Sequence, residues 1–173
     1  MTSLKRLSGM RTYLVGAMDR IPCGGTVWRN KIMPHLSALN ISVINPCDHP
    51  LEQVSVRDSI TDLKQSGNFA DIRKQFGQIR NIDLRCVDVC DFIIAHVDIN
   101  VHACGTYEEI VTANRQKKPV LIWCEQGKSQ APNWLFFMLP HEHIFDNMDA
   151  LLEYLNQINS QNDILDLDRW IFL

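Results

Sequence analysis

Short apolar runs alternate with segments of helical periodicity along most of the chain, and this alternation constrains the fold more than any other feature. The runs are rich in β-branched and aromatic residues, as buried strands are, and they cover residues 11–17, 41–44, 92–97, 119–124 and 143–145. The intervening segments carry apolar side chains at helical spacing and cover residues 27–39, 70–90, 105–116, 132–139 and 148–158. Strands that are apolar on both faces and separated by helices predict a parallel sheet of about five strands in a three-layer α/β sandwich.

Two stretches do not follow this alternation. Residues 46–68 are polar and predict a long loop, and loops of that length often form binding surfaces. Residues 1–10 precede the first strand and are expected to be a flexible N-terminus. No internal repeat, low-complexity tract or linker interrupts the rest, so residues 11–173 are expected to form a single domain.

The composition excludes several classes of protein. A chain of 173 residues with 46% apolar content can bury a core, which excludes a disordered or fibrous protein. The net charge is −3 and there is no long basic block, so binding to a nucleic acid polymer is not expected. The longest apolar runs are too short to cross a membrane, and the first residues lack the apolar core of a secretory signal. We therefore expect a cytoplasmic protein.

The six cysteines are scattered without a C-x-x-C pair and are expected to be reduced thiols. Cys86 and Cys90 stand one helical turn apart, and His141 and His143 lie close together, which are spacings that a metal site can use. Buried small side chains and loop histidines explain the same residues without a metal. We expect neither a metal nor a cofactor.

A parallel sheet of this kind binds ligands outside the carboxyl ends of its strands. The candidate binding residues at that edge are Gly16, Met18, Asp19 and Arg20 with the first strand, Asp48 after the second, Asp98, Asn100 and His102 after the third, and Gly105 and Thr106 where the next helix opens. The sequence therefore predicts a binding crevice between these loops.

Two carboxylates are candidates for the chemistry of that crevice. Glu109 lies near the start of the third expected helix, where the helix dipole favours an ionised group. Asp83 lies on the apolar stripe of the second expected helix, where a carboxylate is costly to bury unless it is paired or used. A hydrogen bond to Arg80, Arg85 or a backbone amide is the structural alternative for Asp83, and Glu108 is interpreted as an ordinary helix-start carboxylate. Two carboxylates converging on one crevice suit acid–base or nucleophilic chemistry at a glycosidic carbon.

Several motifs, taken in order, resemble the nucleoside 2-deoxyribosyltransferase family. They are the Tyr13-Leu14-Val15-Gly16-Ala17 run, the Asn81-Ile82-Asp83 box, Asp91 before the third strand, and the Gly105-Thr106-Tyr107-Glu108-Glu109 box. The resemblance spans residues 11–158, and its most specific part is the N-x-D box joined to the G-T-x-x-E box. It implies a flavodoxin-like sheet and cleavage of the N-glycosidic bond of a 2′-deoxynucleoside without a cofactor.

The resemblance also implies a role for particular residues. Glu109 matches the nucleophile, which attacks C1′ and forms a covalent deoxyribosyl-enzyme while the base leaves. Asp83 matches the carboxylate that exchanges a proton with the nucleobase. Tyr13 matches an aromatic hydroxyl that hydrogen-bonds the nucleophile, and an ordinary strand tyrosine is the alternative. Asn133 matches an asparagine donated across a subunit contact, which implies a homo-oligomer with shared active sites.

One position departs from the family pattern. Ala103 stands where the transferases carry an Asp that holds the 5′-hydroxyl group. The related 2′-deoxynucleoside 5′-monophosphate N-hydrolases carry a Ser there that holds phosphate. In place of position 103, Asn100, His102 or Thr106 could contact the 5′ group of the sugar.

Two alternatives to a transferase stay open. Arg20, Gly24 and Gly25 partly resemble a phosphate-binding loop of the hydrolases, in which water replaces the second base. The other alternative is a catalytically silent nucleotide- or NAD-binding module. The sequence lacks a G-x-G-x-x-G fingerprint after the first strand, which argues against this alternative. The preferred prediction is a deoxyribosyltransferase whose partners are small-molecule deoxynucleosides and nucleobases.

Overall fold

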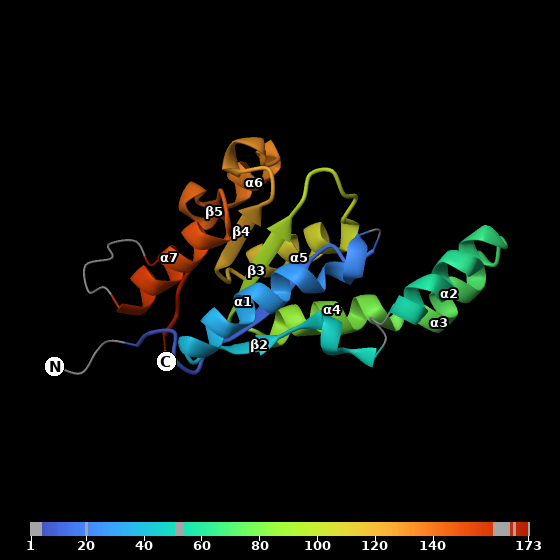
Figure 1. The fold of residues 1–173 in the computed structure, drawn as a ribbon, viewed down its shortest axis with the longest axis horizontal. Coiled ribbons are helices and arrows are strands. Elements are labelled where there is room, and N and C mark those ends of the chain that lie inside the picture. The colour runs from blue at the N-terminus through green and yellow to red at the C-terminus, as the bar shows by residue number, and fades with distance from the viewer. Residues whose placement is uncertain (1–4, 20, 51–53, 161–166, 168, 173) are drawn as a thin grey trace.

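A computed structural model of the protein describes residues 5–19, 21–50, 54–160, 167 and 169–172. Figure 1 shows a central sheet with helices on both sides. Its strands are β1 (Arg11–Gly16), β2 (Ser42–Ile44), β3 (Phe92–Val97), β4 (Val120–Cys124) and β5 (Ile144–Phe145). They pair in parallel in the order β2-β1-β3-β4-β5. The predicted parallel sheet in a three-layer α/β sandwich is confirmed.

The two faces of the sheet are covered by different helices because successive strand residues point to opposite sides. One face carries α1 (Thr26–Ala38) and α7 (Met148–Ser160), and the other carries α4 (Gln78–Val89), α5 (Cys104–Arg115) and α6 (Asn133–Met138). On β3, Phe92 and Ile94 join the core under α1 and α7, whereas Ile93 and Ala95 join the core under α4 and α5. In the described part of the chain, no helix is long and apolar enough to span a bilayer.

The main difference from the sequence-based expectation lies between β2 and β3. Residues 46–68, expected as a loop, contain a short 3-10 turn and α2 (Val54–Gln65). The helix expected over residues 70–90 is divided into α3 (Phe69–Phe76) and α4. The division falls at Gly77, because glycine is a poor helix former.

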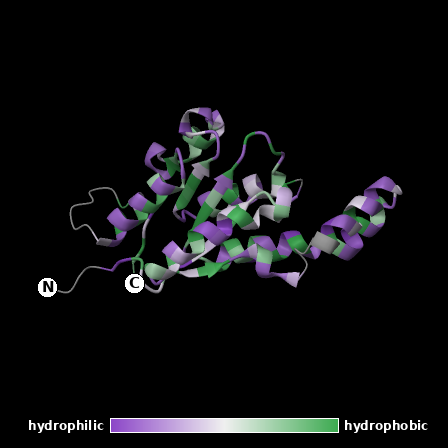
Figure 2. Ribbon diagram, viewed as in Figure 1, coloured by the Kyte–Doolittle hydropathy of each residue, from purple (hydrophilic) through white to green (hydrophobic). Residues whose placement is uncertain are grey.

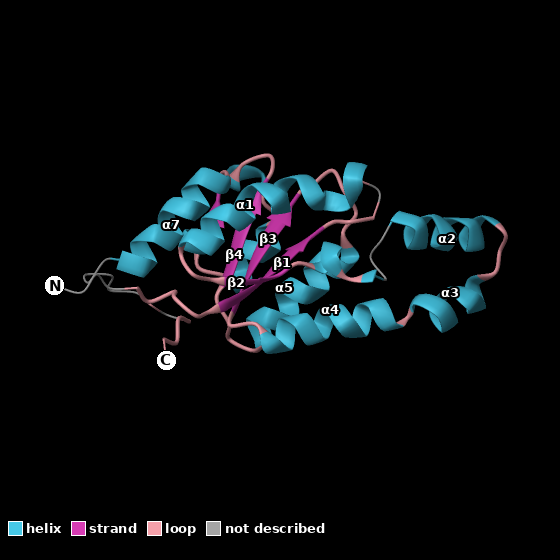
Figure 3. Cartoon of the chain, turned by 60° about the horizontal axis from the view of Figure 1, so that its bottom comes forward, coloured by secondary structure: helices cyan, strands magenta, loops and turns pink. Residues whose placement is uncertain are grey.

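The helices α2 and α3 form an arm, residues 54–76, that projects beyond the sheet in both views (Figures 1 and 3). None of the described residues of α3 is buried, and Phe69 is 67% exposed. Figure 2 shows that much of this helical arm is hydrophilic, in contrast to the strands. The arm therefore depends little on the hydrophobic core.

Residues 5–10, placed by the sequence in a flexible N-terminus, lie against the body of the fold. Leu7 is fully buried, and its N–H group donates to Asn159 Oδ1 at 3.0 Å. The N–H group of Gly9 donates to the carbonyl oxygen of Asn40 at 2.9 Å. The packed part of the chain thus begins before residue 11.

Candidate active site

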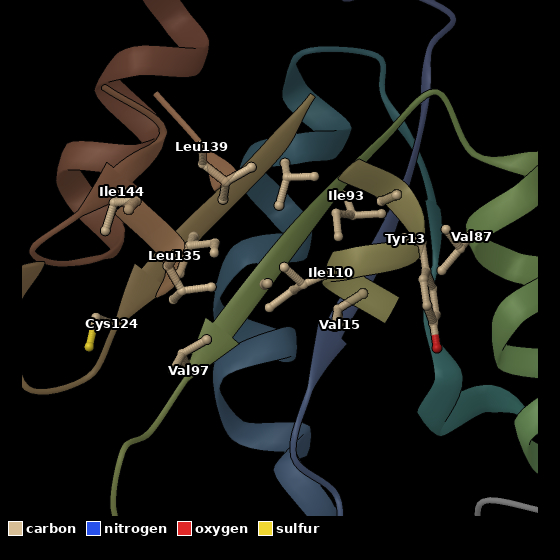
Figure 4. Packing of buried hydrophobic residues seen from close by; sticks show 14 of the residues in the cluster. Tyr13, Val15, Val87, Ile93, Val97, Ile110, Cys124, Leu135, Leu139 and Ile144 are labelled. Carbon is tan, nitrogen blue, oxygen red and sulfur yellow. The ribbon is translucent and has the colours of Figure 1, made fainter. Parts of the chain in front are cut away.

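The side chain of Tyr13 joins the two carboxylates that the sequence singled out. Its hydroxyl donates to Glu109 Oε1 at 2.6 Å and lies 3.3 Å from Asp83 Oδ1. Tyr13 is 1% exposed, and Figure 4 shows its ring beside Val87 with the hydroxyl directed out of the apolar cluster. Side chains from β1, α4 and α5 therefore meet at one point.

Helix and strand periodicity explain why these side chains converge. Side chains alternate between the two faces along a strand, so Tyr13 and Val15, two residues apart on β1, point to the same face of the sheet. Glu109 lies on the buried face of α5 with Ile110 and Ala113, and it is only 7% exposed. A carboxylate buried to this degree requires a hydrogen-bond donor. The Tyr13 hydroxyl is such a donor.

The electrostatics of the site favour the protonated forms of Tyr13 and Asp83. Burial and the neighbouring Glu109 and Asp83 raise the pKa of Tyr13 far above its ordinary value, so its hydroxyl stays a proton donor. This hydroxyl has one proton, which the shorter contact directs to Glu109. Burial raises the pKa of Asp83, although its hydrogen bond with Tyr13 opposes that effect. When Asp83 is protonated it becomes the donor to the Tyr13 oxygen.

The three side chains line a cavity of about 420 Å³ at the carboxyl ends of β1 and β3. This volume lies within the range of small-molecule sites. The predicted site residues that line it are Tyr13, Gly16, Met18, Asp19, Asp83, His102, Gly105, Thr106 and Glu109. The structure thus brings most of the predicted residues to one place.

Other predicted site residues lie elsewhere. Asp48 accepts a hydrogen bond from Asn45 Nδ2 at 3.1 Å. Asp98 Oδ1 accepts from the backbone N–H of Asn100 at 2.9 Å and from a side-chain amide at 2.7 Å, so these two residues form a turn instead of lining the cavity. Asn133 is exposed at the start of α6, away from the cavity of this chain. Arg20 lies outside the described residues.

Arg29 is a cavity residue that the sequence reasoning missed. It is fully buried, and its guanidinium donates to the carbonyl oxygens of Gly25 and Gly16, each at 3.0 Å, and of Leu14 at 3.3 Å. Burial lowers its pKa, but an arginine stays charged in a protein. Arg29 shares the inner face of α1 with Ile32. A charged residue on an apolar helix face is therefore the sequence signal that could have identified it.

The helical arm supplies further cavity residues that were not predicted. Arg57, Ile60 and Lys64 line the cavity from α2, and Ile79 does so from α4. These positions on α2 are spaced as on one face of a helix. The sequence analysis expected a loop over this segment, so these positions were not assigned to one helix face.

Arg80 and Arg85, the two arginines considered as structural partners of Asp83, lie against other carboxylates. Arg80 forms an ion pair with Glu108, which lowers the pKa of Glu108 through this hydrogen bond. Arg85 lies 3.7 Å from Asp88. Asp83 contacts neither arginine and instead meets Tyr13.

The described residues contain no group of three or more His, Cys, Asp or Glu side chains that could hold a metal ion. All six cysteines are free thiols. Burial raises the pKa of Cys90 to about 11, so this thiol stays protonated near neutral pH. Cys90 therefore does not supply a reactive thiolate.

The strand order β2-β1-β3-β4-β5 is the flavodoxin-like order of doubly wound α/β proteins, and the chain shares its fold with solved 2-deoxyribosyltransferases. The enzyme of Bacillus psychrosaccharolyticus matches with a TM-score of 0.56 and 15% identity, over 83% of this chain and 91% of that one. The enzyme of Leishmania mexicana matches with a TM-score of 0.56 and 16% identity, over 85% and 97%. A CMP N-glycosidase of Clostridium botulinum gives a TM-score of 0.45 at 16% identity, over 84% and 98%. No protein-family model and no curated protein matches the sequence.

Proposed function

We propose that this protein cleaves the N-glycosidic bond of 2′-deoxynucleosides and transfers the deoxyribosyl group to a second nucleobase. One observation carries the proposal: the buried Tyr13 hydroxyl contacts both Glu109 and Asp83 inside a cavity at the carboxyl edge of the sheet. The residues are those that match the family's motifs. The fold shared with 2-deoxyribosyltransferases supports the same assignment.

In the proposed first step, a carboxylate oxygen of Glu109 attacks C1′ of the sugar as the bond to the base breaks. The Tyr13 hydroxyl holds Oε1 of this carboxylate at 2.6 Å and fixes its orientation. The product of the step is a deoxyribosyl ester of Glu109. Attack of a second nucleobase on C1′ then releases the carboxylate, and two displacements retain the configuration at C1′.

Asp83 is proposed to give a proton to the departing base. Burial raises the pKa of its carboxyl group, which keeps a proton available closer to neutral pH than in an ordinary aspartate. After base exchange, the same carboxylate accepts the proton that the incoming base loses. The acid and the base of the reaction cycle are thus one residue.

The proposed enzyme is a homo-oligomer that shares its active sites. Trp134 and Phe137 on α6 are 68% and 75% exposed, and Asn133 is exposed beside them. Large exposed aromatic side chains are typical of subunit contacts. This surface suits a contact that carries Asn133 to a neighbouring cavity. Light scattering on the purified protein tests the oligomer, and a monomer at assay concentration would contradict it.

Product analysis tests the reaction. The protein is incubated with thymidine and adenine, and the products are separated by chromatography. Formation of deoxyadenosine supports the transferase, whereas thymine and free deoxyribose indicate a hydrolase with the same carboxylates. If neither product forms from any of the four deoxynucleosides or their 5′-monophosphates, the enzymatic proposal is wrong.

A further inference from the structure

The β3–α5 loop, residues 98–103, forms one side of the cavity (Figure 1). His102 and Ala103 of this loop line the cavity, and Cys104 continues the lining into the first turn of α5. The residues of the loop are half-buried or exposed, and Ile99 is 42% exposed. A loop with so little burial needs other contacts to keep one position.

The side chain of Gln126, in the turn after β4, supplies such contacts. Its Oε1 accepts a hydrogen bond from the backbone N–H of Ile99 at 3.1 Å, and its Nε2 donates to Asp98 Oδ1 at 2.7 Å. The N–H group can only donate and the carboxylate can only accept, so the orientation of the amide is fixed. Among the described residues, Gln126 is the one side chain outside the loop that hydrogen-bonds to it.

The turn that carries Gln126 is itself held at the edge of the sheet. The N–H group of Glu125 donates to the carbonyl oxygen of Val97 at 2.8 Å, and Oε2 of Glu125 lies 2.8 Å from His96 Nε2. The N–H group of Gly127 donates to the carbonyl oxygen of the last residue of β4 at 3.0 Å. Gln126 thus lies between two residues fixed to β3 and β4, and its amide ties the loop to the sheet.

We propose that Gln126 is a positioning residue of the site, whose amide holds the β3–α5 loop where His102 and Ala103 contact the substrate. This inference rests on the proposed function. Glu109 is held by the buried face of α5 and by Tyr13, so the nucleophile does not depend on the loop. The loop therefore serves substrate binding. When a binding-competent loop is populated only in part, the apparent affinity falls by that fraction.

Gln126→Ala tests this role, because it removes both hydrogen bonds and changes no residue that lines the cavity. The test measures steady-state base release from each of the four 2′-deoxynucleosides, well below the melting temperature. KM should rise about 10-fold while kcat changes less than about threefold, since binding is weakened and the reacting groups stay in place. Gln130→Ala removes an exposed glutamine of the same segment and is the matched control, which should change neither parameter.

A double variant separates positioning from a merely structural role. Gln126→Glu keeps the size of the side chain and the acceptor for Ile99, but it loses the donor and places a second carboxylate against Asp98. KM should rise at least as much as in Gln126→Ala, because like charges repel. Adding Asp98→Asn removes the repulsion and supplies an amide donor, so KM should recover by at least about threefold. An unchanged KM in Gln126→Ala, or no recovery in the double variant, would overturn the proposal.

Binding to a Glu109→Gln variant separates this inference from the proposed function, because binding needs no turnover. Calorimetry with the four deoxynucleosides should give a Kd about 10-fold higher when Gln126→Ala is added to Glu109→Gln. Turnover by the wild type with an unchanged KM in Gln126→Ala would overturn the role of Gln126 and leave the proposed reaction intact. Binding that depends on Gln126, without any turnover by the wild type, would support that role and overturn the reaction.

Discussion

The two walls of the cavity are built in different ways. On the wall formed by β1, α4 and α5, Tyr13 and Glu109 are 1% and 7% exposed and contact each other directly. On the other wall, Arg57 and Lys64 come from a helical arm whose α3 contributes no buried residue among those described. Bond cleavage requires groups fixed to within a fraction of an ångström. The first wall should therefore control rate and stability, whereas the helical arm should contribute little to stability.

The largest effect is expected at Glu109. Glu109→Ala removes the proposed nucleophile, so kcat should fall by about three or more orders of magnitude while the fold is kept. Glu108→Gln is the matched control, because Glu108 is the neighbouring carboxylate and pairs with Arg80 on the exposed side of the helix. It should retain turnover within about threefold of the wild type. Comparable losses in both variants, measured by base release, would contradict the assignment.

A slightly smaller effect is expected at Asp83, together with a change in pH dependence. Burial raises the pKa of Asp83. In the proposed reaction, the protonated form gives its proton to the departing base. Wild-type kcat should therefore decline on the alkaline side as pH rises through this raised pKa. Asp83→Asn has no proton to give, so kcat should fall about 10²- to 10⁴-fold and the alkaline decline should disappear. A pH profile of kcat measures both results.

The same substitution has the opposite consequence for stability. The folded state holds the Asp83 proton more tightly than the unfolded chain does, so this group lowers stability as pH rises from about 4, its unfolded pKa, through the raised folded value. Asp83→Asn removes that loss. The melting temperature of the variant relative to the wild type should therefore increase across this pH window, and a constant difference would show that burial does not shift the pKa.

Arg29 lies on α1 and supports the first wall indirectly, because its guanidinium donates to the carbonyl oxygens of β1. Arg29→Met leaves the carbonyl oxygens of Gly16 and Gly25 without the guanidinium that now donates to them. The free energy of unfolding in urea should fall by about 2–4 kcal/mol, because buried acceptors then lack partners. Lys31→Met, at an exposed position of the same helix, is the control and should change it by less than about 0.5 kcal/mol. Equal stability of the two variants would contradict the role given to Arg29.

The smallest effect is expected on the helical arm. Phe69 is 67% exposed at the start of α3, so Phe69→Ser should change the free energy of unfolding by less than about 0.5 kcal/mol. Thermal unfolding followed by circular dichroism measures this change. A loss of 2 kcal/mol or more would show that the arm is packed against another surface in solution, and the contrast between the two walls would then fail.

The sheet could be predicted from the sequence because burial on both faces selects apolar, β-branched strands, as in Phe92–Val97 and Val120–Cys124. The helix α2 could not be predicted from the sequence, because Val54, Val56 and Ile60 are β-branched residues of low helix propensity. The break at Gly77 was missed because the apolar period continues across it.

The carboxylates of the site were predictable from a local rule, that a charged residue on an apolar helix face is paired or used. The same rule applies to Arg29, which occupies the inner face of α1. The place of Arg57 could not be predicted, because its approach to Gly24 depends on the position of a helix that the local pattern does not reveal. Asp98 does not line the cavity, and its carboxylate accepts a hydrogen bond from the backbone of Asn100 in a turn that the local pattern did not indicate.

Mass spectrometry of the protein after incubation with a donor and no acceptor base tests the central claim most directly. The donor is a 2′-deoxynucleoside or its 5′-monophosphate, and the reaction is stopped by acid before peptide digestion. The account predicts a deoxyribosyl group on the peptide that contains Glu109, and no such group in Glu109→Ala. An active protein that carries no adduct at Glu109, or carries it on another residue, would contradict the account.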